Sequence, residues 1–388
     1  MKIAFFMVPL LNHGGGAEKS FITFANGMAR RGHKVGIVNL SKSFYKSLAA
    51  ALSLYYMHRS FPMRLTDREV ESMPFESVEW LRVGFKSLKR NLQKFEVIYS
   101  KNEILDLGVL RLVGFKNISP VIVGIHTPIY YRITSSLHSE FHNFLYSDFF
   151  YRDLIKSCTA VHVTNLNDKT LVEERYPQLT PKIYKICLPL DTDKFRPMKS
   201  EDKQNEKFKV LFAARLTEQK GVDILAKVIR KLSLEPIFES LNFTIAGSGE
   251  LEKKVRNLGR KFKNVHYLGH VVQDEMPVAY SSNDILIAPF RNEPMSWVGL
   301  EAQSCGLPVI VSGVSGPQDM IIDGETGFIV KNKPENFVEQ IKYFYNLKKK
   351  DRTKFSHFGT KAREHIIKKF DPNLVFDKLE KMLEEGRI

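Results

Sequence analysis

Residues 209–223 read Lys-Val-Leu-Phe-Ala-Ala-Arg-Leu-Thr-Glu-Gln-Lys-Gly-Val-Asp, and this stretch decides the fold. Its first part, 209–214, is a short and mostly apolar run that is typical of a buried strand. A polar loop follows, and Gly221 then precedes a segment with helical periodicity. A strand that leads through a short loop into a helix is the repeating unit of α/β sheets.

The same unit recurs along the chain. In the first half, the apolar run 3–8 leads through Asn12-His13-Gly14-Gly15-Gly16 into a helix and then into the run 35–40. Further runs lie at 97–99, 121–125, 161–164, 183–188, 243–246, 265–268, 284–289, 308–311 and 327–330. This alternation predicts an α/β protein with two Rossmann-like, doubly wound parallel sheets.

A polar stretch at 191–207 separates the two sets of strands and is typical of a linker. We therefore expect one domain over 1–195 and a second over 208–370. The chain from 334 onward has a helical pattern to its end.

Length and composition limit the class of protein. The chain has 388 residues, of which 43% are hydrophobic and 26% charged, which is typical of a globular protein of two or three domains. This excludes disorder, collagen and coiled coil as the main architecture. No apolar run reaches the length of about 18 residues that a membrane-spanning helix needs. The three cysteines, Cys158, Cys187 and Cys305, are too few and too scattered for a disulfide framework or a zinc site, so a cytoplasmic protein is expected.

The charge is strongly positive. There are 58 Lys and Arg residues against 43 Asp and Glu, for a net charge of +15. Residues 1–190 hold 25 of the basic and 15 of the acidic residues, so the first half carries most of the excess. A basic surface attracts nucleic acid, anionic lipid or anionic sugar polymers. The alternative is a protein with a high isoelectric point and no such partner.

Two cations flank the turn in the opening stretch. Arg215 lies at the end of the expected strand, and Lys220 comes just before the helix, whose first N–H groups attract anions. Together they would clamp a diphosphate, with Arg as a planar fork and Lys as a point charge. The alternative is two solvated surface cations.

Two glutamates follow a later strand. Glu293 falls in the loop after the run 284–289, and Glu301 lies eight positions further on, about one turn into the next helix. Carboxylates at such places accept hydrogen bonds from vicinal sugar hydroxyls, and the N–H groups at the helix start can hold a phosphate.

These residues carry a resemblance to a known family. Residues 210–330 resemble the C-terminal domain of the retaining GT-B glycosyltransferases of family 4. The shared patterns are Arg215-Leu216 with Lys220-Gly221-x-Asp223, then Ala246-Gly247-x-Gly249, Val265-x-Tyr267-x-Gly269, Glu293 with Glu301, and Ala302-x-x-x-Gly306-x-Pro308-Val309. Near the N-terminus, Gly15-Gly16-Ala17-Glu18 and Arg31-Gly32-His33-Lys34-Val35 are similar to two further patterns of that family.

The resemblance implies a donor site for a nucleoside diphosphate sugar. Arg215 and Lys220 would bind the diphosphate and stabilise the leaving group in place of a metal ion, so no metal site is expected. Glu301 would bind the ribose hydroxyls, and Glu293 would contact hydroxyls of the transferred sugar. The family transfers the sugar at the front face, so no enzymic nucleophile is named.

Backbone contacts and a histidine complete the implied site. Gly15 and Gly16 would let the first loop approach the donor phosphate without a Cβ clash, and the backbone of Ser296 and Trp297 would meet the sugar and phosphate. His126 ends the run 121–125, where similar enzymes carry a histidine that faces the donor sugar or the acceptor. The alternative for His126 is a purely structural role.

The resemblance also implies the reaction. A hexosyltransferase is expected to move a sugar from a nucleoside diphosphate sugar, with UDP as the expected nucleotide and no cofactor, to a hydroxyl. The expected acceptor is a lipid-linked oligosaccharide or an anionic cell-surface polysaccharide precursor, as in capsule or lipopolysaccharide synthesis. The terminal helix, 371–388, would cross back onto the first domain.

Other functions compete with this interpretation. One is a nucleotide-sugar 2-epimerase of the same fold, and another is a catalytically inactive scaffold. A basic protein that binds nucleic acid or an anionic surface is a third, although no helix-turn-helix, RRM or zinc pattern supports a nucleic-acid partner.

Three segments of the first half favour contact with an anionic membrane on its cytoplasmic side. Residues 80–95 have the pattern of a basic amphipathic helix, although packing of its apolar face on the sheet is the preferred interpretation. Residues 141–152 mix aromatic and basic side chains, as do residues 55–64. Such segments suit a lipid-linked or anionic acceptor.

Overall fold

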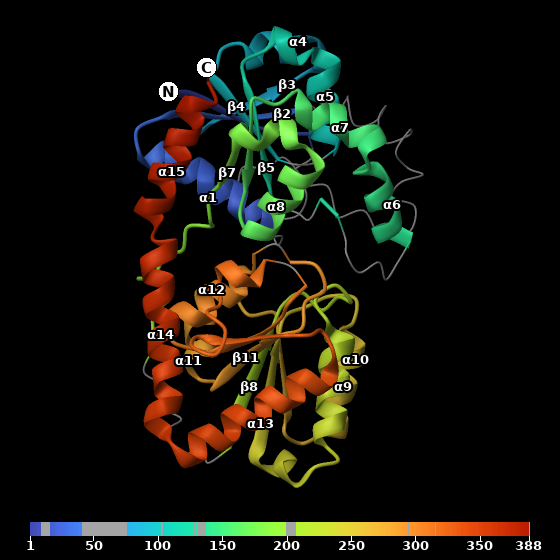
Figure 1. The fold of residues 1–388 in the computed structure, drawn as a ribbon, viewed down its shortest axis with the longest axis vertical. Helices are drawn as coiled ribbons and strands as arrows, with labels where there is room; N and C mark the ends of the chain where they lie inside the picture. The colour runs from blue at the N-terminus through green and yellow to red at the C-terminus, as the bar shows by residue number, and fades with distance from the viewer. Residues whose placement is uncertain are drawn as a thin grey trace. The chain divides into compact units, whose positions relative to one another are not determined.

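The computed structural model describes residues 1–8, 16–40, 76–101, 104–126, 129–130, 137–198, 207–293, 295–314 and 316–387. The chain divides into two compact units (Figure 1). Unit 1 combines Met1–Leu188 with Asn373–Ile388, and unit 2 is Pro189–Pro372. The segment 55–64 and Gly15 lie outside the described residues.

Unit 1 contains a seven-stranded parallel sheet in the order β3-β2-β1-β4-β5-β6-β7. Its strands are β1 (Lys2–Met7), β2 (Lys34–Leu40), β3 (Glu79–Val83), β4 (Val97–Lys101), β5 (Val121–Ile125), β6 (Ala160–Val163) and β7 (Ile183–Lys185). Every residue of β4, β5 and β6 is buried, as expected for central strands covered by helices on both faces.

The helices of unit 1 connect these strands. They are α1 (Gly16–Arg30), α4 (Phe85–Leu92), α5 (Ile104–Val113), α6 (Leu137–Leu145), α7 (Asp148–Lys156), α8 (Leu166–Arg175) and the returning α15 (Pro372–Glu385). Two short 3₁₀ turns, Phe115–Asn117 and Pro177–Lys182, complete the connections among the described residues.

The prediction of one helix over 80–95 is wrong. Residues Glu79–Val83 form the edge strand β3, which pairs with β2, and α4 begins only at Phe85 after the extended Gly84. Backbone pairing with β2 outweighs the helical periodicity of the first residues, because an edge of the sheet offers them partners. On α4 the apolar residues Leu88 and Leu92 are fully buried, so this face packs inside the unit rather than facing a membrane, which agrees with the preferred interpretation of the sequence.

Unit 2 contains a six-stranded parallel sheet in the order β10-β9-β8-β11-β12-β13. Its strands are β8 (Phe208–Ala213), β9 (Leu241–Ala246), β10 (Val265–Gly269), β11 (Ile285–Ala288), β12 (Val309–Ser312) and β13 (Gly327–Val330). Each lies within two residues of a predicted run. The prediction of two doubly wound parallel sheets is therefore confirmed.

The helices of unit 2 include the long C-terminal pair. They are α9 (Val222–Leu232), α10 (Glu252–Lys261), α11 (Met276–Ser281), α12 (Trp297–Ser304), α13 (Pro334–Lys350) and α14 (Arg352–Phe370), with 3₁₀ turns at Pro236–Ser240 and Pro317–Asp319.

Unit 2 begins before the expected linker. The Leu190 N–H donates to the Phe370 carbonyl at 2.9 Å, and the Arg363 guanidinium donates to the carbonyls of Phe195 and Ser304 at 3.1 and 2.6 Å. These bonds tie residues 190–195 to α12 and α14, which is why the compact unit begins at Pro189 rather than beyond 195.

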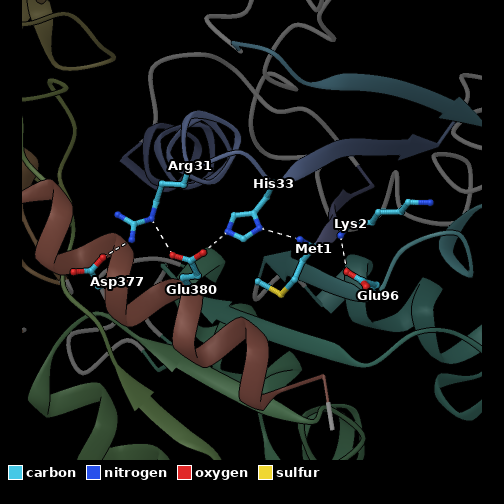
Figure 2. A network of polar contacts seen from close by, with 7 residues as sticks. All are labelled: Met1, Lys2, Arg31, His33, Glu96, Asp377 and Glu380. Atoms are coloured by element: carbon cyan, nitrogen blue, oxygen red, sulfur yellow. Dashed lines mark hydrogen bonds and ion pairs between the residues drawn. The ribbon is translucent and has the colours of Figure 1, made fainter.

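The helix α15 returns to unit 1 and lies beside α1, and a polar network holds it there (Figures 1 and 2). Arg31 pairs with Asp377 and donates to Glu380 at 3.0 Å, while His33 Nε2 donates to the other oxygen of Glu380 at 2.7 Å. Gly32, with a φ of +86°, ends α1 between these two residues. In this chain, the Arg-Gly-His pattern serves to bind α15.

None of the helices in the described ranges combines the length and the apolar character that crossing a bilayer requires.

We expect Glu380→Ala to destabilise the protein by about 1 kcal/mol, because it removes a partner from both Arg31 and His33 at a partly exposed site. Urea denaturation measures the free energy of unfolding. The control is Lys381→Ala, because the Lys381 side chain is 74% exposed. Equal effects of the two variants would show that the network does not hold α15.

Candidate donor-binding site

The strand order of unit 2 marks the place for a ligand. From β8 the chain adds β9 and β10 on one side, and then β11, β12 and β13 on the other. The direction of winding thus changes between β8 and β11, which are neighbours and parallel. Ligands of open α/β sheets bind at the carboxyl ends of strands at such a switch point.

Glycines let the loops at this edge come close together. Gly221 has a φ of +73°, and a Cβ there would lie 2.0 Å from the Pro289 carbonyl oxygen at the end of β11. In the loop after β9, a Cβ on Gly247 would lie 1.9 Å from the Ala214 carbonyl oxygen. Any larger residue at either position would push these loops apart. The glycines of the two sequence patterns therefore set the spacing of the site.

Lys220 and Glu293 lie together at this edge. The Lys220 ammonium donates to Glu293 Oε2 and lies 4.8 Å from the centroid of the Phe290 ring. Their side chains are only 16% and 23% exposed. Two residues that the sequence assigned to one ligand, 73 positions apart, are thus in direct contact. Arg215, in the same loop as Lys220, is exposed to solvent.

Arg291 is a residue of this site that sequence reasoning missed. Its guanidinium forms a two-pronged ion pair with Asp223, with both distances 2.8 Å, and also donates to the Glu218 carbonyl. Burial raises the pKa of Asp223, but the hydrogen bonds and charge of Arg291 outweigh burial and hold that pKa below its ordinary value. The signal was Asp223 in the shared pattern, since a partly buried carboxylate, here in the first turn of α9, needs a cation.

Ser296 and Trp297 begin α12 beside a small pocket. Ser296 is the N-cap, and its Oγ accepts a hydrogen bond from the Gly299 N–H at 3.1 Å. The pocket is lined by Phe290, Glu293, Met295, Ser296, Ser312 and Gly316, among others. Ser296 is therefore a helix cap, and its side chain lies at the pocket wall.

Glu301 lies deeper than Glu293. It is 4% exposed, and its Oε2 accepts a hydrogen bond from the Tyr280 hydroxyl at 2.7 Å. Burial, with the negative charge of Glu301, raises the pKa of Tyr280 well above its ordinary value, so the phenol keeps its proton to donate. One carboxylate oxygen is thus bonded within the protein, and the ribose contact of Glu301 stays a prediction.

The other predicted residues belong to unit 1. Gly16 begins α1. His126 follows β5, and its Nε2 lies 2.8 Å from the Tyr99 hydroxyl oxygen. Within the described residues, no three His, Cys, Asp or Glu side chains gather in a group that could hold a metal ion.

Comparison with known families identifies the domain. Residues 193–362 match the family described as glycosyl transferases group 1. This stretch is a group 1 glycosyltransferase domain. The prediction of an enzyme of the glycosyltransferase class is confirmed.

Proteins similar to this chain include one from a cps region and one named for capsular polysaccharide biosynthesis. An uncharacterized 41.2 kDa protein in the cps region of Klebsiella pneumoniae is 28% identical over 71% of this chain and 76% of its own length. The capsular polysaccharide biosynthesis glycosyltransferase CapM of Staphylococcus aureus is 26% identical over 46% of each chain.

Solved structures confirm the GT-B fold of this glycosyltransferase. Anabaena HepE, crystallised in complex with UDP, has a TM-score of 0.72 at 18% identity and covers 99% of this chain and 100% of its own. Sucrose-phosphate synthase of Thermosynechococcus elongatus has a TM-score of 0.76 at 16% identity, over 99% and 98% of the two chains.

We expect Arg291→Met to lower the free energy of unfolding by about 2 kcal/mol, because it leaves the partly buried Asp223 carboxylate without its cation. A double-mutant cycle with Asp223→Asn should give a coupling energy above about 1 kcal/mol, measured by urea denaturation. The control is Arg230→Met, at an exposed position of α9. A coupling energy near zero would contradict the role of this ion pair.

Proposed function

We propose that the protein is a retaining hexosyltransferase that needs no metal ion and uses a UDP-sugar. The observation that carries this is the contact of Lys220 with Glu293 beside the pocket, at the switch point of a group 1 glycosyltransferase domain. The complex of HepE with UDP supports the choice of nucleotide. The roles of the individual residues in binding and transfer are part of the proposal.

Lys220 would exchange one anion for another when the donor binds. Without a donor its ammonium bonds to Glu293; a diphosphate would take that ammonium, and Arg215 would add a second cation. The Glu293 carboxylate would then accept hydrogen bonds from hydroxyls of the sugar. In this way one ion pair keeps both charges satisfied before the substrate arrives.

The reaction breaks one bond at the anomeric carbon and forms another. The bond to the diphosphate oxygen breaks, and its electron pair stays on the diphosphate, where Arg215 and Lys220 stabilise the growing negative charge. The acceptor hydroxyl oxygen bonds to the same face of that carbon. Its proton passes to the leaving diphosphate oxygen, so the step needs no base from the protein.

The acceptor we propose is a lipid-linked oligosaccharide or an anionic cell-surface polysaccharide precursor, modified on the cytoplasmic side of the membrane. The capsule-region relatives and the net charge of +15 support this class. A 2-epimerase is the competing function. It would convert the sugar nucleotide without needing an acceptor, so no glycosylated acceptor would form.

We expect UDP at one hundred times its dissociation constant to stabilise the protein by about 2.7 kcal/mol, with no change on adding EDTA. GDP, ADP and CMP should give smaller thermal shifts. Lys220→Ala should lose the UDP shift, because the diphosphate loses its cation, whereas Lys227→Ala, exposed on α9, should keep it. If none of the nucleotides shifted the melting temperature of the unaltered protein, the transferase proposal would fail.

An aromatic surface of unit 1 supports contact with a membrane. The exposed residues Phe141 and Phe144 of α6 and Phe149 and Phe150 of α7 touch one another in a chain of ring contacts, with centroids 4.8 to 6.1 Å apart. Exposed apolar clusters of this kind mark protein or membrane contacts. A second surface that includes α7 carries Lys116 and Lys156, together with Arg111 paired to Asp153, and its excess of cations suits anionic head groups.

We expect the protein to float with vesicles that contain phosphatidylglycerol, and Phe149→Glu to reduce the bound fraction severalfold because it places a charge in the aromatic surface. Phe149 is 85% exposed, so the fold should tolerate the change. The matched control is Leu234→Glu in unit 2, at a residue 87% exposed. Equal binding of the two variants would argue against this surface.

A further inference from the structure

The buried Tyr99 and His162 and the partly buried His126 of unit 1 form one hydrogen-bonded network that the proposed reaction does not use. The Tyr99 hydroxyl oxygen lies 2.8 Å from His126 Nε2 and 2.7 Å from His162 Nδ1. At the far end, His162 Nε2 lies 2.8 Å from the Ile186 carbonyl oxygen. Tyr99 comes from β4, His126 from the end of β5 and His162 from β6, which are neighbouring strands.

A glycine on the middle strand makes this network possible. Gly124 of β5 pairs in register with His162, and a Cβ at Gly124 would lie 2.1 Å from the Tyr99 hydroxyl oxygen and 2.6 Å from His126 Nε2. Tyr99 therefore reaches past β5 through the space that a side chain would fill. Phe24 of α1 covers the network, with its ring centroid 5.5 Å from that of His126 and 5.3 Å from that of His162.

The direction of each hydrogen bond follows from one end. The Ile186 carbonyl can only accept, so His162 carries its proton on Nε2 and its Nδ1 accepts. Tyr99 must then donate its hydroxyl proton to His162 Nδ1. With that proton used, the Tyr99 oxygen can only accept, so His126 donates from Nε2. Both histidines then have a bare Nδ1: that of His162 accepts from Tyr99, and that of His126 accepts from no group in this network.

The charge states agree with this assignment. Burial lowers the pKa of His162 to about 4, and burial together with His162 and Lys101 lowers the pKa of His126 well below its ordinary value. Burial also raises the pKa of the Tyr99 phenol well above its ordinary value. Near pH 7 both imidazoles are neutral and the phenol is protonated, which is the state that the hydrogen bonds require.

The open end of the network is an acceptor atom at the edge of the sheet. His126 Nδ1 is buried and has no hydrogen-bond partner among the described residues. A buried acceptor without a donor is unfavourable, so such atoms in proteins point to a missing partner. His126 also follows the carboxyl end of a central parallel strand, where ligands of these sheets bind.

We propose that Tyr99 and His162 are positioning residues that hold His126 as the Nε2–H tautomer, so that its Nδ1 accepts a hydrogen bond from a substrate hydroxyl. The catalytic consequence rests on the proposed function. The hydroxyl belongs either to the transferred sugar or to the acceptor. The chemistry is the same in both cases, and kinetics separate them.

The first test reads the tautomer without substrate. Nitrogen-15 NMR of the histidine-labelled protein, assigned with His126→Gln, should show His126 with a proton on Nε2 and a bare Nδ1. In Tyr99→Phe, which keeps the ring but removes the hydroxyl, His126 should become a mixture of tautomers. A proton on Nδ1 of His126 in the unaltered protein would overturn the proposal.

The second test measures turnover. Tyr99→Phe should lower kcat/KM at least about twofold, because His126 presents its acceptor nitrogen only part of the time. The control is Tyr176→Phe. The Tyr176 hydroxyl donates to Asp148, away from the hydrogen-bonded network of Tyr99, so this variant should keep its kcat/KM. A loss confined to the donor's kcat/KM assigns the hydroxyl to the sugar, and one confined to the acceptor's assigns it to the acceptor.

The two tests separate this proposal from the proposed function. A mixture of tautomers in Tyr99→Phe with an unchanged kcat/KM would overturn the positioning role. If the unaltered protein transferred no sugar from any nucleotide sugar, the proposed function would fail. The NMR test would still show whether Tyr99 and His162 fix the tautomer of His126.

Discussion

The ion pair of Arg291 and Asp223 holds the loop after β11 against the first turn of α9, and the rest of the candidate donor-binding site depends on this contact. Arg291 also donates to the Glu218 carbonyl, so one guanidinium joins the loop after β11 both to the loop that carries Lys220 and to the first turn of α9. Gly221 permits the close approach because it has no Cβ to meet Pro289. Lys220 consequently lies at Glu293, although the two are far apart in the chain.

Unit 1 uses the same physical device for a different purpose. There, Gly124 leaves the space through which Tyr99 reaches across a strand to His162, and the hydrogen bonds then run in one direction from the Ile186 carbonyl to His126. In both units, a missing side chain on one strand or loop lets polar groups from its neighbours meet. Parallel sheets favour this arrangement, because their central strands are covered on both faces and their polar groups must find partners inside.

Much of the fold could be predicted because buried parallel strands appear in the sequence as short apolar runs. The strand β3 was missed because only its last residue is buried, so that its sequence lacks such a run and merges with the helical pattern of α4. The sequence placed Lys220 and Glu293 at one ligand because both follow strands, but their ion pair with each other was not predicted. Arg291 was missed because its partner Asp223 is 68 positions away, and nothing in the local pattern distinguishes it from a surface cation.

The sequence by itself determined the two α/β sheets and, through its resemblance to a known family, the group 1 glycosyltransferase domain and the residue types at the candidate donor-binding loops, because apolar periodicity and motif spacing are local properties of the chain. Only the tertiary structure decided which groups are paired. It buried Glu301 against Tyr280, joined Arg291 to Asp223, and gave His126 a hydrogen-bond direction that begins at Ile186. The reason is that hydrogen bonds and ion pairs depend on distance in space, and the packing of separate strands sets that distance.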